Sequence, residues 1–193
     1  MNSNSVKGFV TLAIFLLPGV TAAYGQNLLK NGNFESFTGN DPKFWATSNI
    51  PKVMVVVSPD SKCKSGASSV RCEVKDFHGS KMAGMISQSG IPVSGTMLTL
   101  KGFYLLHSVG KDAAFISIEL VDQEGNTVKI CHENLTGPAA NFTPFTMTGD
   151  IPHSAVKLDI KLTILPDENS ESLHEGSYVL FDDLELVPVA PVG

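Results

Sequence analysis

The alternation of apolar and polar residues along the chain predicts a protein built from β-strands. Residues 155–165 show the pattern most clearly: Val156, Leu158, Ile160, Leu162 and Ile164 alternate with lysine, aspartate and threonine. A period of two is typical of a strand with one buried face. Together with runs rich in β-branched residues, it predicts ten strands, at residues 27–35, 52–58, 67–75, 82–89, 97–107, 114–122, 127–132, 142–148, 155–165 and 177–187.

Short strands separated by turn residues indicate an all-β fold. Residues 26–193 contain no stretch of helical period, no internal repeat and no linker rich in proline or serine. Glu124-Gly125-Asn126, for example, is typical of a hairpin turn. We therefore expect one domain at 26–193, a β-sandwich jelly roll of about ten antiparallel strands.

The closing strand contains a carboxylate at an unexpected position. Counted in twos, Tyr178, Leu180, Asp182, Leu184 and Leu186 share a face, and the leucines mark that face as the core side. A buried carboxylate must be paired, hydrogen-bonded or bound to a metal, because removing a bare charge from water is costly. Asp182 is therefore predicted to point inward and to have a partner elsewhere in the fold.

The first 25 residues have the features of a secretory signal peptide. Lys7 precedes an apolar run at 9–20, and Ala23 and Gly25 offer small residues before a cleavage site at Gln26. The run is short for a membrane span, and Pro18-Gly19 interrupts it. We expect a secreted protein, extracellular or periplasmic, that does not insert into a membrane.

Composition narrows the classes of partner. The formal charge is -5, and there is no basic stripe of the kind that meets phosphates, so a nucleic-acid partner is not expected. The five histidines are scattered without zinc-site spacing, and no motif indicates a catalytic nucleophile. We expect a monomer.

Three cysteines in a secreted chain allow one disulfide. Cys63 and Cys72 flank the turn around Ser65-Gly66, so a link between them is predicted, with Cys131 left over. The alternative is three thiols, with Cys131 acting as a small hydrophobe.

The two ends of residues 26–193 carry a resemblance to a known family. The opening Asn27-Leu28-Leu29-Lys30-Asn31-Gly32-Asn33-Phe34-Glu35, the following Trp45, and the closing Phe181-Asp182-Asp183-Leu184-Glu185-Leu186 resemble the jelly-roll carbohydrate-binding modules of families four, nine and twenty-two. The resemblance implies a galactose-binding-like β-sandwich without catalytic activity. It also implies that Trp45 packs near the first strand.

The resemblance implies a glycan cleft on a concave sheet. The outward residues of the two long middle strands, Lys101, Phe103, His107, Phe115 and Glu119, offer the aromatic surface and polar groups that sugars need. The alternative is that loops cover Phe103 and Phe115, which then form a second core.

The resemblance further implies a structural Ca²⁺ that joins the two ends. The family holds calcium with the glutamate of the opening motif, the aspartate of the closing strand and carbonyls of a Gly/Ser-rich loop. Glu35 and Asp182 match the first two, and Lys64-Ser65-Gly66 resembles the third. The alternative is an Asp182 that is hydrogen-bonded to a lysine or to backbone amides.

Three functions remain open at this stage. The first is a secreted, non-catalytic module that binds a polysaccharide or oligosaccharide. The second is an envelope structural or adhesion protein that keeps the fold without binding glycan. The third is a small polysaccharide lyase or hydrolase, which needs converging side chains such as two carboxylates about 5–10 Å apart. Arg71 is the single arginine of the chain, which weighs against a lyase site.

Overall fold

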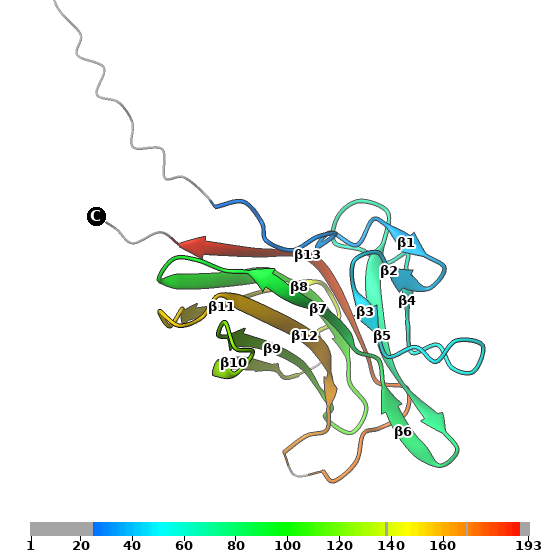
Figure 1. The fold of residues 1–193 in the computed structure, drawn as a ribbon. Coiled ribbons are helices and arrows are strands. Elements are labelled where there is room, and N and C mark those ends of the chain that lie inside the picture. Colours follow the sequence, from blue (N-terminus) through cyan, green and yellow to red (C-terminus); the bar gives the residue numbers. More distant parts are fainter. Residues whose placement is uncertain (1–24, 138, 169, 190–193) are drawn as a thin grey trace, which may run out of the picture.

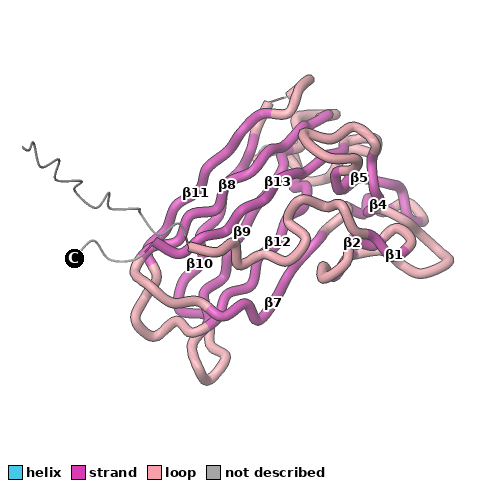
Figure 2. The backbone as a smooth tube through the Cα atoms, turned by 90° about the horizontal axis from the view of Figure 1, so that it is seen from above, coloured by secondary structure: helices cyan, strands magenta, loops and turns pink. Residues whose placement is uncertain are grey.

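The computed structural model describes residues 25–189 except 138 and 169; the predicted signal peptide thus lies almost wholly outside it. All its regular elements are strands (Figures 1 and 2), and no helix among these residues is long and apolar enough to cross a membrane. The strands are β1 (Phe37–Thr38), β2 (Asp41–Pro42), β3 (Ala46–Thr47), β4 (Val57–Asp60), β5 (Ser69–Phe77), β6 (Ser80–Ala83), β7 (Ile86–Pro92), β8 (Met97–His107), β9 (Ala113–Val121), β10 (Thr127–Leu135), β11 (Thr143–Asp150), β12 (Lys157–Leu165) and β13 (Tyr178–Val189).

Two antiparallel sheets pack face to face, which confirms the predicted β-sandwich. One has five strands in the order β10-β9-β12-β7-β3, and the other six, with β11-β8-β13-β5-β4 in line and β6 paired to β5. The orders β11-β8-β13-β5-β4 and β10-β9-β12-β7 can be followed in Figure 2. The core lies between them and takes the residues that the alternation assigned to it, among them Leu100 and Leu106 from β8, Ile116 from β9 and Leu158 and Ile160 from β12.

Three predicted strands need correction. Residues 27–35 form turns and extended chain rather than a strand. Residues 52 and 53 form a turn, Met54 makes an isolated bridge with Ile50, and β4 begins only at Val57. The strand predicted at 82–89 is two strands, β6 and β7, separated at Gly84. In each case the bounds of the strand depend on pairing with a distant segment, and the local sequence pattern does not show that segment.

The opening segment binds to β13 without forming a strand of its own (Figure 1). The N–H of Leu28 donates to the carbonyl of Leu186 at 2.8 Å, and the N–H of Leu184 donates to the carbonyl of Gly32 at 2.8 Å. The Asn27 side chain adds bonds to Leu184 and Leu186, both 2.9 Å. Gly32 is required here, because a Cβ would lie 2.3 Å from the Leu184 carbonyl oxygen.

The prediction that Asp182 points inward is wrong, because β13 contains a β-bulge next to it. The register to β8 shifts between Asp182 and Glu185, and Asp183 has a φ of 49°. The extra residue reverses the alternation, so Phe181 and Leu184 both face the core. Asp182 therefore lies on the outer face of the six-stranded sheet, opposite Phe103, yet its exposed fraction is 0% because a loop covers it.

Candidate functional site

The predicted glycan residues are divided between the two sheets. Lys101, Phe103 and His107 belong to β8 in the six-stranded sheet, whereas Phe115 and Glu119 belong to β9 in the five-stranded sheet. They point outward on opposite sides of the sandwich. The expectation that all five line one cleft is therefore wrong, because β8 and β9, although consecutive, pair in different sheets.

The outer face of the six-stranded sheet is occupied by the protein's own side chains. Leu105 and Leu180 pair there and are buried. Lys64 lies over the Phe103 ring, 4.7 Å from its centroid, and Lys101 forms an ion pair with Glu185 at 2.8 Å. The center of this face is thus filled.

Three stacked planar side chains cover the part of this face that lies next to β5. His107 stacks on Tyr178 with ring centroids 5.0 Å apart, and the Arg71 guanidinium lies 3.6 Å from the Tyr178 centroid. Arg71 is held in turn by Asp60 at 3.4 Å and Glu73 at 3.3 Å. His107 itself is exposed, but its neighbours leave little of Tyr178 free.

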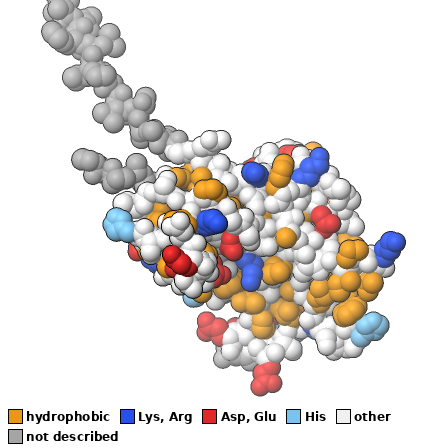
Figure 3. Space-filling view, viewed as in Figure 1, with side chains coloured by type: hydrophobic (Ala, Val, Ile, Leu, Met, Phe, Trp, Pro, Cys, Tyr) orange, Lys and Arg blue, Asp and Glu red, His pale blue; other side chains and the backbone are white. Residues whose placement is uncertain are grey.

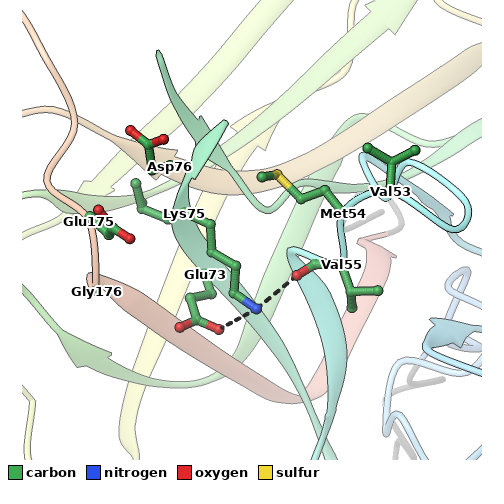
Figure 4. Close-up of a pocket in the computed structure, with 9 residues that line it drawn as sticks. Val53, Met54, Val55, Glu73, Lys75, Asp76, Glu175 and Gly176 are labelled. Carbon is green, nitrogen blue, oxygen red and sulfur yellow. Dashed lines mark hydrogen bonds and ion pairs between the residues drawn. The ribbon is translucent and has the colours of Figure 1, made fainter. Parts of the chain in front are cut away.

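A hollow of about 510 Å³ lies beside β5 and is shown in Figure 4. Glu73, Asp76 and Glu175 line one side, and Val53 and Val55, with exposed fractions of 63% and 37%, line the other. The face of the molecule drawn in Figure 3 carries an apolar patch at its lower right.

The carboxylates of this hollow are unsuited to general acid catalysis. Lys75 lies 3.4 Å from Glu73, and Lys81 lies 2.9 Å from Asp76 and 2.8 Å from Glu175. Hydrogen bonds from the Gly79 N–H and from Lys81 lower the pKa of Asp76. A general acid requires the opposite shift. The geometry therefore gives no support to a glycosidase pair here.

The outer face of the five-stranded sheet is open and polar. The β9–β12 and β9–β10 registers place Ser117 beside Lys161 and His132, with Phe115 and Glu119 on the same face. The Phe115 and His132 rings lie 5.9 Å apart, half-buried and exposed respectively. We call Phe115, Ser117, Glu119, His132 and Lys161 the polar sheet face. His132 and Lys161 were not predicted, although their outward parity could have indicated both.

The second predicted site is built around the loop of residues 61–68. Lys64 and Ser65 donate their N–H groups to Asp182 Oδ2 at 2.7 and 3.2 Å, and the Asp183 N–H donates to Oδ1 at 2.8 Å. The structure thus shows backbone amides as partners of Asp182, which is the alternative left open by the sequence. Burial raises the pKa of Asp182, although these three N–H bonds oppose the shift.

The same loop binds Glu35, so the two predicted calcium ligands do come together. Ala67 donates its N–H to Glu35 Oε1 at 3.0 Å, and Ser68 does so at 3.2 Å. Gly66 has a φ of 68°, and a Cβ there would lie 2.1 Å from Glu35 Oε1. The loop is therefore shaped around both carboxylates.

Carboxylates gather at this loop, and backbone N–H groups bind the side-chain oxygens of Asp182 and Glu35. The pKa of the Cys63 thiol is raised by its burial and then by four nearby carboxylates, Asp182, Glu35, Asp183 and Asp60. Oxygen ligands of this type are those that Ca²⁺ prefers. In the described part of the chain no three acidic, histidine or cysteine side chains form a metal site alone, so backbone carbonyls would have to complete one.

The predicted disulfide is wrong in this structure, where Cys63, Cys72 and Cys131 are all free thiols. Cys72 alternates with Val70 and Val74 and points into the core, whereas Cys63 belongs to the loop that covers Asp182. Burial raises the pKa of Cys72 to about 12, which makes it an unreactive core thiol.

Comparisons with known proteins agree with this architecture. No family model matches the sequence, and no curated protein matches it. Among solved structures, a family 61 carbohydrate-binding module in complex with β-1,4-galactotriose has a TM-score of 0.52 and 18% identity, over 83% of this chain and 97% of that one. The family 22 xylan-binding domain of Paenibacillus barcinonensis has a TM-score of 0.55 and 16% identity, over 88% and 98%.

Longer proteins also contain the fold. The enzymatically active domain of tailspike protein 4 of bacteriophage CBA120 has a TM-score of 0.57 and 18% identity, and the match covers 83% of this chain but only 21% of the tailspike chain. At these identities the likeness shows the fold alone. The chain therefore has the β-sandwich jelly-roll fold found in carbohydrate-binding modules, as the opening and closing motifs predicted.

Proposed function

We propose that this protein binds carbohydrate without catalysis, on the polar sheet face. The observation that supports the proposal is an aromatic residue, Phe115, standing on an open sheet face among hydroxyl, amine and carboxylate groups. An aromatic ring covers the apolar face of a sugar, and the polar groups around it hydrogen-bond to hydroxyls. The opposite face is filled by its own side chains and offers no comparable surface.

Replacing Phe115 with alanine should weaken retention on a polysaccharide by about tenfold, because the stacking surface is lost. Affinity electrophoresis through gels that contain candidate polysaccharides, chosen after a glycan array, measures this. Phe103→Ala is the matched control: it removes the same ring from the opposite sheet and should leave retention unchanged. Equal retention of Phe115→Ala and the wild type would refute the assignment.

The same retention assay distinguishes glycan binding from the alternative of an envelope structural or adhesion protein. A protein that keeps the fold without binding glycan would show no retention on any polysaccharide.

We further propose that residues 1–25 direct export and that the monomer acts outside the cytoplasm.

We also propose that the loop of residues 61–68 binds Ca²⁺ together with Glu35 and Asp182. A cation bound only by the folded state stabilises it by about 2.7 kcal/mol at a hundredfold excess over its dissociation constant. EDTA should therefore lower the Tm by several degrees, and added Ca²⁺ should restore it.

Two variants locate this response. Glu35→Gln should abolish the effect of EDTA, whereas Glu185→Gln should preserve it, because Glu185 is a half-buried carboxylate on β13 that pairs with Lys101 and lies outside the loop. An unchanged Tm in EDTA, with no calcium found by elemental analysis of the native protein, would contradict the site.

A further inference from the structure

Phe44 is an exposed aromatic residue in a strained conformation. Its exposed fraction is 64%, the highest among the large exposed hydrophobic residues of the described chain. Its φ is 71°, in the left-handed region that bulky side chains rarely adopt. Such strain persists only where the surroundings impose it.

The surroundings of Phe44 hold it from both sides. The Asn31 side chain donates to the carbonyls of Ser36 at 2.9 Å and Lys43 at 3.2 Å. On the other side, the Trp45 indole is buried and donates to the carbonyl of Lys30 at 3.0 Å. With both neighbours fixed, the Phe44 ring is held toward solvent.

A hollow of about 340 Å³ lies beside this ring, at the edge of the five-stranded sheet. Lys30, Ser87 and Ser89 contribute polar groups to its lining. The Lys30 ammonium lies 5.7 Å from the Phe44 centroid, and the buried Gln88 side chain fixes the Lys30 backbone with two bonds of 3.0 and 2.9 Å. An aromatic surface thus borders a space lined by hydroxyls and an amine.

This hollow continues the polar sheet face. Ser117 on β9 pairs with Lys161 on β12, Lys161 with Ser87 on β7, and Ser87 with Ala46 on β3, two residues from Phe44. These residues form a row across four neighbouring strands in the order β9-β12-β7-β3, all of which are labelled in Figure 1. Since neighbouring strands lie about 4.8 Å apart, three steps separate β9 from β3 by roughly 14 Å.

We propose that Phe44 is a second stacking platform for the same carbohydrate. The ligand is then an extended chain of several sugar rings that lies across the strands, with one ring on Phe115 and a more distant ring on Phe44. This inference rests on the proposed function and adds the ligand's length and direction. A monosaccharide or disaccharide is too short to contact both platforms.

The test uses a series of oligosaccharides of two to six sugar units, prepared from a polysaccharide that retains the full-length protein. Calorimetry on the wild type should show affinity that rises with length. Phe44→Ala should bind the hexasaccharide about tenfold more weakly and the disaccharide unchanged, because only the longer chain reaches the second ring. Phe44→Trp should keep the preference for length, and Val53→Ala, which removes apolar surface from the turn at the hollow beside β5, should have no effect.

The outcomes separate the two proposals. A Phe44→Ala variant with wild-type affinity for the hexasaccharide overturns the second platform and leaves glycan binding at Phe115 intact. Equal weakening at every length shows an indirect effect on the fold and also overturns it. A wild type retained by no polysaccharide removes the proposed function, and this inference with it.

Discussion

Replacing Asp182 with alanine should lower the free energy of unfolding by about 3 kcal/mol, because three backbone N–H groups lose their acceptor at once and each of these part-buried hydrogen bonds contributes about 1 kcal/mol. These donors belong to Lys64, Ser65 and Asp183, and the carboxylate that serves them is fully buried. Urea titration in calcium-free buffer measures the effect. The fluorescence of Trp45, the single tryptophan and itself buried, reports unfolding.

Asp183→Ala is the matched control for this variant. The Asp183 side chain accepts one bond, from the Ser65 hydroxyl at 2.8 Å, in a solvent-exposed position. Its replacement should cost about 1–2 kcal/mol, because one exposed hydrogen bond is lost and alanine tolerates the left-handed φ of 49° less well than aspartate does. If Asp182→Ala were as stable as Asp183→Ala, the amide partners of Asp182 would not be important for stability.

The stability of the wild type and that of Asp182→Ala should also depend differently on pH. Burial raises the pKa of Asp182 above its ordinary value of 3.8, so the folded state binds more protons than the unfolded state in the window just above pH 3.8. This contribution to stability therefore falls as pH rises through that window. Asp182→Ala should lose it, and the difference between the two stability curves isolates it from carboxylates such as Asp76, whose pKa is lowered.

Gly84→Ala should destabilise the fold by about 3 kcal/mol, at the upper end for an overpacked site. A Cβ at Gly84 would lie 2.3 Å from the Val56 carbonyl oxygen, 2.7 Å from the Glu73 nitrogen and 2.8 Å from the Cys72 Cα. All three are backbone atoms, so no side chain can turn away. The strand pairing between β4 and β5 would have to shift.

A second glycine provides the comparison. A Cβ at Gly149 would approach only the Cys131 side chain, with the sulfur at 2.9 Å, and a side-chain end can rotate. Gly149→Ala should therefore cost well under half as much as Gly84→Ala in the same thermal and urea measurements. Comparable losses at both glycines would show that the contact with backbone is not the cause.

Strands with a long, regular pattern were predictable from the sequence. β8 runs from Met97 to His107 as expected, and the inward residues of β12, such as Leu158 and Ile160, are those that the alternation selected. In these segments the partner strands impose the same period that the sequence shows. Local pattern and tertiary structure therefore agree.

The sites were less predictable, because they depend on pairing between distant segments. Counting in twos cannot detect the bulge at Asp183, and it therefore placed Asp182 on the wrong face. Sequence order also cannot show that β8 and β9 join different sheets, which divided the predicted cleft. Phe44 gave no periodic signal, since its exposed position depends on a single backbone angle and on its neighbours.

The bonds between the opening segment and β13 have a consequence for the order of folding. Leu28 and Leu186 are neighbours in space but lie at opposite ends of residues 25–189. Closing so long a loop is slow and entropically costly, and a contact of this range cannot form during synthesis until β13 has been made. During synthesis the segment around Leu28 therefore stays unpaired until β13 has been made, and its contacts with β13 are among the last that can form.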